Sequence, residues 1–135
     1  MVEQKRIVSR PDKDDLRRSF RYALRGFRYA LQAERNVRIH SCAAVLVLLL
    51  SAWLRLTDIE WLLIIIAIAL VFIAEMFNTV VELMIDLATT EQSPLARRAK
   101  DTAAGAVLVA ALTATAIGCA VFGPRLWLIT DQLLH

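Results

Sequence analysis

Four polar side chains recur at helical spacing in one otherwise apolar stretch of this 135-residue chain. They are Glu75, Asn78, Glu82 and Asp86. Their intervals of three, four and four residues would place them along one face of a helix. Carboxylates with an amide suit a hard cation such as magnesium, which prefers oxygen ligands and keeps water molecules for phosphate groups. Glu82 and Asp86 could equally be solvated acids at a helix end, but an ionisable side chain deep in a membrane, as Glu75 would be, points to function.

The depth of these groups follows from the helical rise. Glu82 comes 21 residues after the start of an apolar run at residue 61, about 32 Å along a helix, which places it near the cytoplasmic boundary of a membrane. Glu75 would lie about 10 Å deeper, while Glu34, Lys100 and Asp101 are expected at the boundary. A deeper carboxylate could act as general base for a lipid hydroxyl, and a lysine beside the acids suits phosphate oxygens. The sequence has no P-loop and no kinase glycine-rich loop, so ATP would bind by another device.

Three apolar runs must position these side chains: residues 41–54, 61–74 and 102–122. The first two have 14 residues each, fewer than the roughly 20 that a spanning helix needs. Both are apolar on all faces, however, and the second continues as a helical pattern without Gly or Pro through residue 87. We therefore predict an all-α membrane protein with a single membrane domain over residues 1–135 and transmembrane helices at residues 37–56, 59–87 and 98–123.

The basic residues are distributed unevenly. Residues 1–40 hold eleven Lys and Arg against five acids, and residues 88–100 hold three more of the 16 in the chain. Such a basic segment could bind nucleic acid or an anionic membrane surface, and the apolar runs favour the membrane. Because basic loops stay on the cytoplasmic side, we predict a cytoplasmic N-terminus and a C-terminus outside. Residues 1–15 and 124–135 are expected to be tails.

Residues 16–33 carry a further helical pattern. Apolar side chains at positions 16, 20, 24, 27 and 31 recur at spacings of three and four, and the arginines lie mostly off that stripe. The pattern predicts an amphipathic helix in the membrane interface, with its arginines toward the headgroups. A helix that only anchors the chain, without a chemical role, explains the pattern equally well.

A few other residues could have metal or redox chemistry. His40 could be a ligand or a proton shuttle, although an interfacial histidine is the commoner case and the interpretation we favour. Cys42 and Cys119 lie far apart within apolar runs and form no C-x-x-C motif, so a zinc site or a redox pair is not expected.

Several strings of residues match a known family. They are A-E-M-F-N-T-V-V-E at 74–82, P-L-A-R-R-A-K-D-T-A-A-G-A-V at 94–107, E-R-N-V-R-I-H at 34–40 and R-G-F-R at 25–28. Over residues 16–124 the chain resembles the small bacterial membrane lipid kinases, which include diacylglycerol kinase and undecaprenol kinase. The motif E-x-x-N-T-x-x-E followed by A-K-D makes this resemblance specific.

The resemblance implies a homotrimer with active sites between neighbouring subunits, and the use of ATP and Mg²⁺. It implies that Glu75 is the general base and that Asn78 supports Glu75 and the substrate. Glu34 and Glu82 would hold the metal that bridges the ATP phosphates. The residues implied in ATP binding are Tyr22, Glu34, Glu82, Glu91, Lys100 and Asp101. Those implied in lipid binding are Arg25, Arg28, Glu75 and Ala104.

The implied substrate is a lipid alcohol of the bacterial inner membrane. The string at 34–40 is similar to that of undecaprenol kinases, whereas diacylglycerol kinases more often carry an acid in place of His40. Undecaprenol is therefore the expected substrate and diacylglycerol the alternative. A small proton-coupled transporter, with Glu75 as its proton site, is the alternative from another class. Lys100, Asp101 and the second acid at Glu82 favour the kinase, because a proton carrier needs none of them.

Overall fold

A computed structural model describes residues 13–89 and 93–134, and all of the regular structure in these residues is helical. The helices are α1 (Lys13–Ala33), α2 (Arg35–Trp53), α3 (Asp58–Ala88) and α4 (Pro94–Leu134). Helices α2, α3 and α4 are each long and apolar enough to cross a membrane. The prediction of an all-α chain is thereby confirmed, and its three apolar segments form helices that are able to span a membrane.

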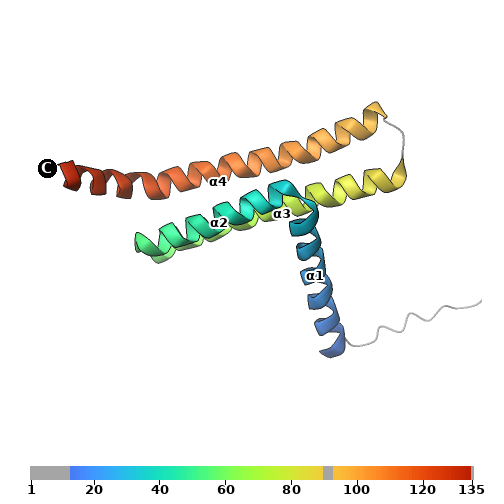
Figure 1. Ribbon diagram of the computed structural model, residues 1–135, viewed down its shortest axis with the longest axis horizontal. Helices are drawn as coiled ribbons and strands as arrows, with labels where there is room; N and C mark the ends of the chain where they lie inside the picture. The colour runs from blue at the N-terminus through green and yellow to red at the C-terminus, as the bar shows by residue number, and fades with distance from the viewer. Residues whose placement is uncertain (1–12, 90–92, 135) are drawn as a thin grey trace, which may run out of the picture.

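The helices α2, α3 and α4 run side by side, and α1 runs across their common direction (Figure 1). Helix α3 packs against both α2 and α4, whereas α2 and α4 do not approach each other closely within the described residues. Among the described helices, α1 touches α2 and α3 but not α4. The long helix α3, which carries the polar face predicted above, is therefore the central element of the chain.

Local contacts explain where helix α4 begins and how it continues past a proline. Helix α4 begins at Pro94 rather than at residue 98, because Ser93 accepts a hydrogen bond from the Ala96 amide (3.1 Å) and Pro94 stands at the first helical position. It also continues through Pro124 to Leu134, so most of the tail expected at residues 124–135 is helical. Proline removes one helical hydrogen bond there, but contacts of the next residue hold the helix in place.

The residue after Pro124 is Arg125, which joins α4 to the end of α2 and to the start of α3. Its guanidinium donates to Glu60 on α3, at 3.2 Å from Nε to Oε1, and to the carbonyl of Leu54 after α2, at 3.0 Å. Glu60 also caps the start of α3, since its Oε2 accepts from the amide (2.7 Å) and hydroxyl (2.8 Å) of Thr57. The turn between α2 and α3 includes Arg55 in the left-handed region, at φ 50°. Helix α2 therefore ends at Trp53, before the expected boundary at residue 56.

Helix α1 is attached to the other helices only near its C-terminal end. Ala30 is buried there, and the ring of Phe27 packs on Phe72 of α3 with centroids 5.7 Å apart. Farther from this junction, the apolar side chains of Leu16 and Phe20 stay exposed. Helix α1 starts at Lys13, three residues before the expected start at residue 16. Its apolar side chains are thus available to contact something outside the single chain.

Candidate active site

Glu75 is the most deeply buried acid among the described residues. It lies on α3, and only 1% of its surface is exposed. The helix around it is continuous, and the hydroxyl of Thr79 donates to the Glu75 carbonyl at 3.0 Å. A buried carboxylate in a membrane-spanning helix is costly without a partner. Its neighbours therefore decide what it can do.

The nearest of these neighbours is His40 on α2. Its Nε2 lies 3.2 Å from Oε1 of Glu75, within ion-pair distance, although the two atoms do not have hydrogen-bond geometry. We had favoured an interfacial histidine over a ligand or proton shuttle at this position. The structure places His40 against the predicted base. A depth estimate could have found this pair: His40 follows Glu34 by six residues, about 9 Å along a helix, close to the depth expected for Glu75.

Two further carboxylates surround Glu75. Glu34 and Glu82 both interact electrostatically with it. Glu34 is the single non-helical residue between α1 and α2, with φ −97° and ψ 124°, and its side chain makes no capping hydrogen bond. Glu82 lies two turns after Glu75 on α3 and is half-buried. The structure therefore brings together the three acids to which the resemblance assigned roles.

Asn78 is joined to Glu82 rather than to Glu75. Its Nδ2 donates to Oε1 of Glu82 at 2.9 Å. Its Oδ1, like Oε1 of Glu75, is buried without a hydrogen-bond partner among the described residues. A buried acceptor left unpaired costs about 1–3 kcal/mol. Oδ1 of Asn78 and the carboxylate of Glu75 therefore mark a place where a donor from outside the chain would be bound.

Lys100 reaches the same region from α4. Its Nζ pairs with Oδ1 of Asp86 at 2.5 Å, and it also interacts electrostatically with Glu82. The sequence placed Asp86 on the polar face of α3 without a partner, and the structure supplies one. Lys100 would have to leave Asp86, at least in part, in order to bind a phosphate group.

The α1 residues expected to contact substrates lie apart from this group. Tyr22, Arg25 and Arg28 are all exposed. The guanidinium of Arg25 stands over the ring of Tyr22, 5.9 Å from its centroid, as a local cation–π contact. No contact described for residues 13–89 and 93–134 joins these three side chains to Glu75.

The remaining expected contacts are not assembled within one chain either. Asp101 and Ala104 are exposed on α4. Glu91 lies outside the described residues. In the parts of the chain that the structure covers, no three His, Cys, Asp or Glu side chains are grouped to hold a metal ion. Mg²⁺, however, is commonly held by one or two carboxylates together with substrate phosphates, and Glu34 and Glu82 are carboxylates of the kind that could supply that smaller donor set.

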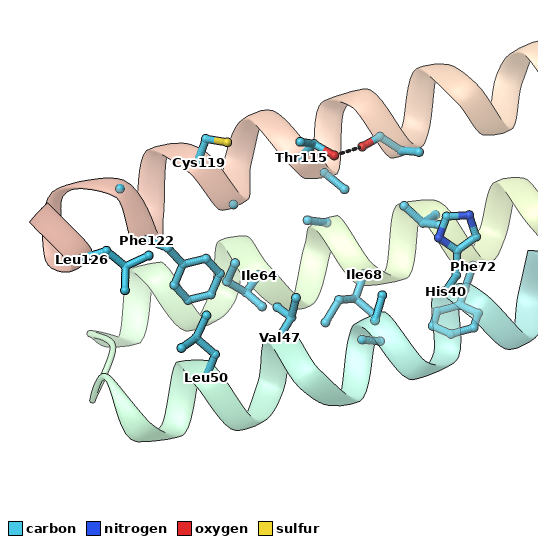
Figure 2. A pocket seen from close by; sticks show the side chains of 18 residues that line it. His40, Val47, Leu50, Ile64, Ile68, Phe72, Thr115, Cys119, Phe122 and Leu126 are labelled. Atoms are coloured by element: carbon cyan, nitrogen blue, oxygen red, sulfur yellow. Dashed lines mark hydrogen bonds between the residues drawn. The ribbon is translucent and has the colours of Figure 1, made fainter.

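An apolar groove extends from this site along the three long apolar helices. It lies between α2 and α4, has α3 as its floor and measures about 560 Å³ (Figure 2). His40 and Phe72 stand at one end and Leu126 at the other. On α4 its lining runs from Ala111 to Leu126, 15 residues or about 22 Å along the helix. Since the hydrocarbon core of a bilayer is about 30 Å thick, the groove is longer than one leaflet is deep.

Together these residues provide what phosphoryl transfer requires. A buried carboxylate can take a proton, two others can hold a cation, and a lysine can neutralise phosphate charge. Positioning and charge neutralisation supply nearly all of the catalysis in that reaction. The groove adds an apolar space that reaches to within one side chain of the carboxylate.

Comparison with known proteins gives a consistent result. The sequence profile of the prokaryotic diacylglycerol kinase family matches residues 21–122. The undecaprenol kinase of Bacillus subtilis (strain 168) is 40% identical over 121 residues, which cover 87% of this chain and 98% of that protein. The diacylglycerol kinase of Synechocystis sp. is 43% identical over 114 residues, 82% of this chain and 65% of that protein. The diacylglycerol kinase of Escherichia coli (strain K12) is 33% identical over 98 residues, 73% of this chain and 80% of that protein.

The profile match extends from within α1 to the last third of α4, so it includes all of α2 and α3, parts of α1 and α4, and the acids around Glu75. The relatives are kinases, which implies a nucleotide and a lipid as substrates. Three apolar helices agree with a protein of the inner membrane. The chain belongs to the prokaryotic diacylglycerol kinase family and is a membrane-embedded lipid kinase.

Proposed function

We propose that this chain transfers the γ-phosphate of ATP to undecaprenol, with Mg²⁺, and that Glu75 is the general base. The observation that carries the proposal is the carboxylate of Glu75, which is buried in a membrane-spanning helix, has no hydrogen-bond partner for Oε1 among the described residues and has two further carboxylates nearby. A hydroxyl is the simplest further donor for this carboxylate, at the oxygen that does not face His40. A lipid alcohol would bring one to this depth.

In the proposed reaction the lipid hydroxyl oxygen attacks the γ-phosphorus of ATP. A bond forms between that oxygen and phosphorus, the bond from phosphorus to the bridging β–γ oxygen breaks, and ADP leaves. The hydroxyl proton passes to Glu75 and from there to solvent before the next turnover. Glu34 and Glu82 would hold Mg²⁺, which supplies neutralisation of phosphate charge when bound. Lys100 would exchange its contact with Asp86 for a phosphate oxygen.

The groove supports a long isoprenoid chain as the apolar part of the substrate. Its polar end is His40, next to the proposed base, so a hydroxyl at Glu75 would leave its chain at the groove entrance. The lining on α4 extends for about 22 Å, beyond the middle of a bilayer about 30 Å thick. An undecaprenol chain can cross the midplane, whereas the acyl chains of diacylglycerol end within one leaflet. The identity with an undecaprenol kinase over nearly all of that protein's length favours the same substrate.

We also propose a homotrimer with shared sites. Asp101 and Ala104 are exposed on α4 and make no described contact with the acids of their own chain. A neighbouring subunit would let these α4 residues face the Glu75 region of another chain. The N-terminus and the Glu34–Lys100 end would face the cytoplasm, where ATP is found, and the C-terminus would lie outside. Helix α1 would lie in the interface, with its exposed apolar side chains in the lipid.

The test is phosphate transfer from γ-labelled ATP by the purified protein in detergent micelles with Mg²⁺. Undecaprenol and diacylglycerol are offered in parallel to wild type, Glu75→Gln and Asp58→Asn, the last removing an exposed acid at the far end of the same helix. Labelled undecaprenyl phosphate from wild type and Asp58→Asn, reduced by about 100-fold or more in Glu75→Gln, is the expected result. A faster rate on diacylglycerol would transfer the substrate assignment to that lipid. Full activity of Glu75→Gln would refute the proposed base.

A further inference from the structure

The charges around Glu75 are unbalanced. Three ionisable side chains act on its carboxylate, and two of them, Glu34 and Glu82, are acids. His40 alone among them can carry a positive charge. Lys100 interacts with Glu82 and Asp86 instead. A base must be ionised to accept a proton, so an acid cluster of this kind needs a nearby cation.

We propose that His40 is the positioning residue for Glu75: in its protonated form it pairs with Oε1 and leaves the other carboxylate oxygen for the substrate hydroxyl. The inference rests on the proposed role of Glu75 as base. His40 acts through Glu75 and touches neither the phosphate nor the metal ligands in this arrangement.

The packing of α2 fixes where this imidazole lies. Val37 stands one turn before His40 on the same helix face and is completely buried. The hydroxyl of Ser41 bonds to the Val37 carbonyl at 2.7 Å, within an unbroken helix. The contact between Nε2 of His40 and Oε1 of Glu75 therefore joins two helices whose separation is set by close packing. A side chain held in this way can hold the carboxylate in turn.

The other side of the imidazole is accessible. The side chain of His40 is 28% exposed and lines the polar end of the groove (Figure 2), whereas that of Glu75 is 2% exposed. His40 can therefore be reached from outside, whereas Glu75 is enclosed by its neighbours. The same opening would let a small imidazole molecule enter the space left by a truncated side chain.

The test compares His40→Ala and His40→Gln with the control Ile39→Ala, whose side chain is exposed on the adjacent position of α2. We expect His40→Ala to lower kcat by about 30-fold, within the range that a close contact between opposite charges supplies near a protein surface, with the KM values for ATP and lipid changed less than about threefold. Added imidazole should restore part of the kcat of His40→Ala and none in Glu75→Gln. His40→Gln, which is polar but uncharged, should stay impaired, and Ile39→Ala should match wild type.

Two results would overturn the inference. One is an unchanged kcat in His40→Ala. The other is a loss in His40→Ala that imidazole does not restore, in protein that elutes from a sizing column like wild type. The double variant His40→Ala with Glu75→Gln separates this inference from the proposed function, because it should be no slower than Glu75→Gln alone. If Glu75→Gln itself is fully active, the proposed base is wrong. If Glu75→Gln is inactive while His40→Ala is normal, only the role of His40 is wrong.

Discussion

The amide of Asn78 donates its hydrogen bond to a carboxylate that we assign to the metal, and removing that amide tests the assignment. Asn78→Leu keeps the size of a buried side chain but deletes the 2.9 Å bond to Glu82. A hydrogen bond to a charged group contributes about 1.5–3 kcal/mol, which corresponds to about 10- to 150-fold in an equilibrium constant. Removing a residue that orients a metal ligand typically costs about 10- to 100-fold in metal affinity. We therefore expect the Mg²⁺ concentration for half-maximal activity to rise by about 10- to 100-fold.

The assay is the initial rate of phosphate transfer over a range of Mg²⁺ concentrations at saturating ATP and lipid. Thr79→Val is the matched control, because its buried hydroxyl bonds only to the backbone of its own helix in the described contacts. It should leave the Mg²⁺ dependence unchanged. A lower kcat for Asn78→Leu with the wild-type Mg²⁺ dependence would refute the reasoning and return Asn78 to the support of Glu75 and the substrate.

Three other described contacts can be tested by substitution. Lys100→Met should raise the KM for ATP by about tenfold, because a charge-assisted contact with phosphate is lost. Asp86→Asn should lower the KM for ATP, because Lys100 then has no ion pair to break before it binds phosphate. Equal KM values in both variants would contradict this. Phe27→Ala removes a ring contact between α1 and α3 that is worth about 1 kcal/mol, so amide exchange in α1 should become faster, and unchanged exchange rates would show that α1 is held by other contacts. Arg125→Gln and Glu60→Gln should each lower the unfolding temperature in detergent without altering the KM for ATP. The double variant should unfold at nearly the same temperature as the single variants, because both substitutions break one network. Fully additive losses in unfolding temperature would argue against a shared network.

The helices could largely be predicted from the sequence, because each one depends on its own composition. Hydropathy and the absence of breakers located α2, α3 and α4, and the Ser93–Pro94 pair is a helix-start signal that could have placed the beginning of α4. The C-terminal extension of α4 was not predictable in this way. It runs past Pro124, and the contact that holds Arg125 is with Glu60, 65 residues earlier in the chain.

In the site, too, the features within one helix could be predicted and the contacts between helices could not. The polar face of α3 was visible in the sequence because Glu75, Asn78 and Glu82 share one helical period. The pairs that join different helices, His40 with Glu75 and Lys100 with Asp86, were not, since spacing along one helix says nothing about its neighbours. Depth along the membrane normal is the sequence signal that could have found the first of these pairs.

Glu34 occupies the only non-helical position between α1 and α2, in an extended backbone conformation. The bend in the chain and the carboxylate proposed to hold Mg²⁺ are therefore one residue. Any rotation of α1 relative to α2 must therefore involve the backbone of Glu34, which carries this carboxylate. By thermodynamic linkage, a nucleotide–metal complex that favours one orientation of α1 must bind more tightly whenever the surrounding lipid favours the same orientation, and by the same factor. The composition of the membrane surface would thus act as an effector of nucleotide affinity through the backbone of Glu34.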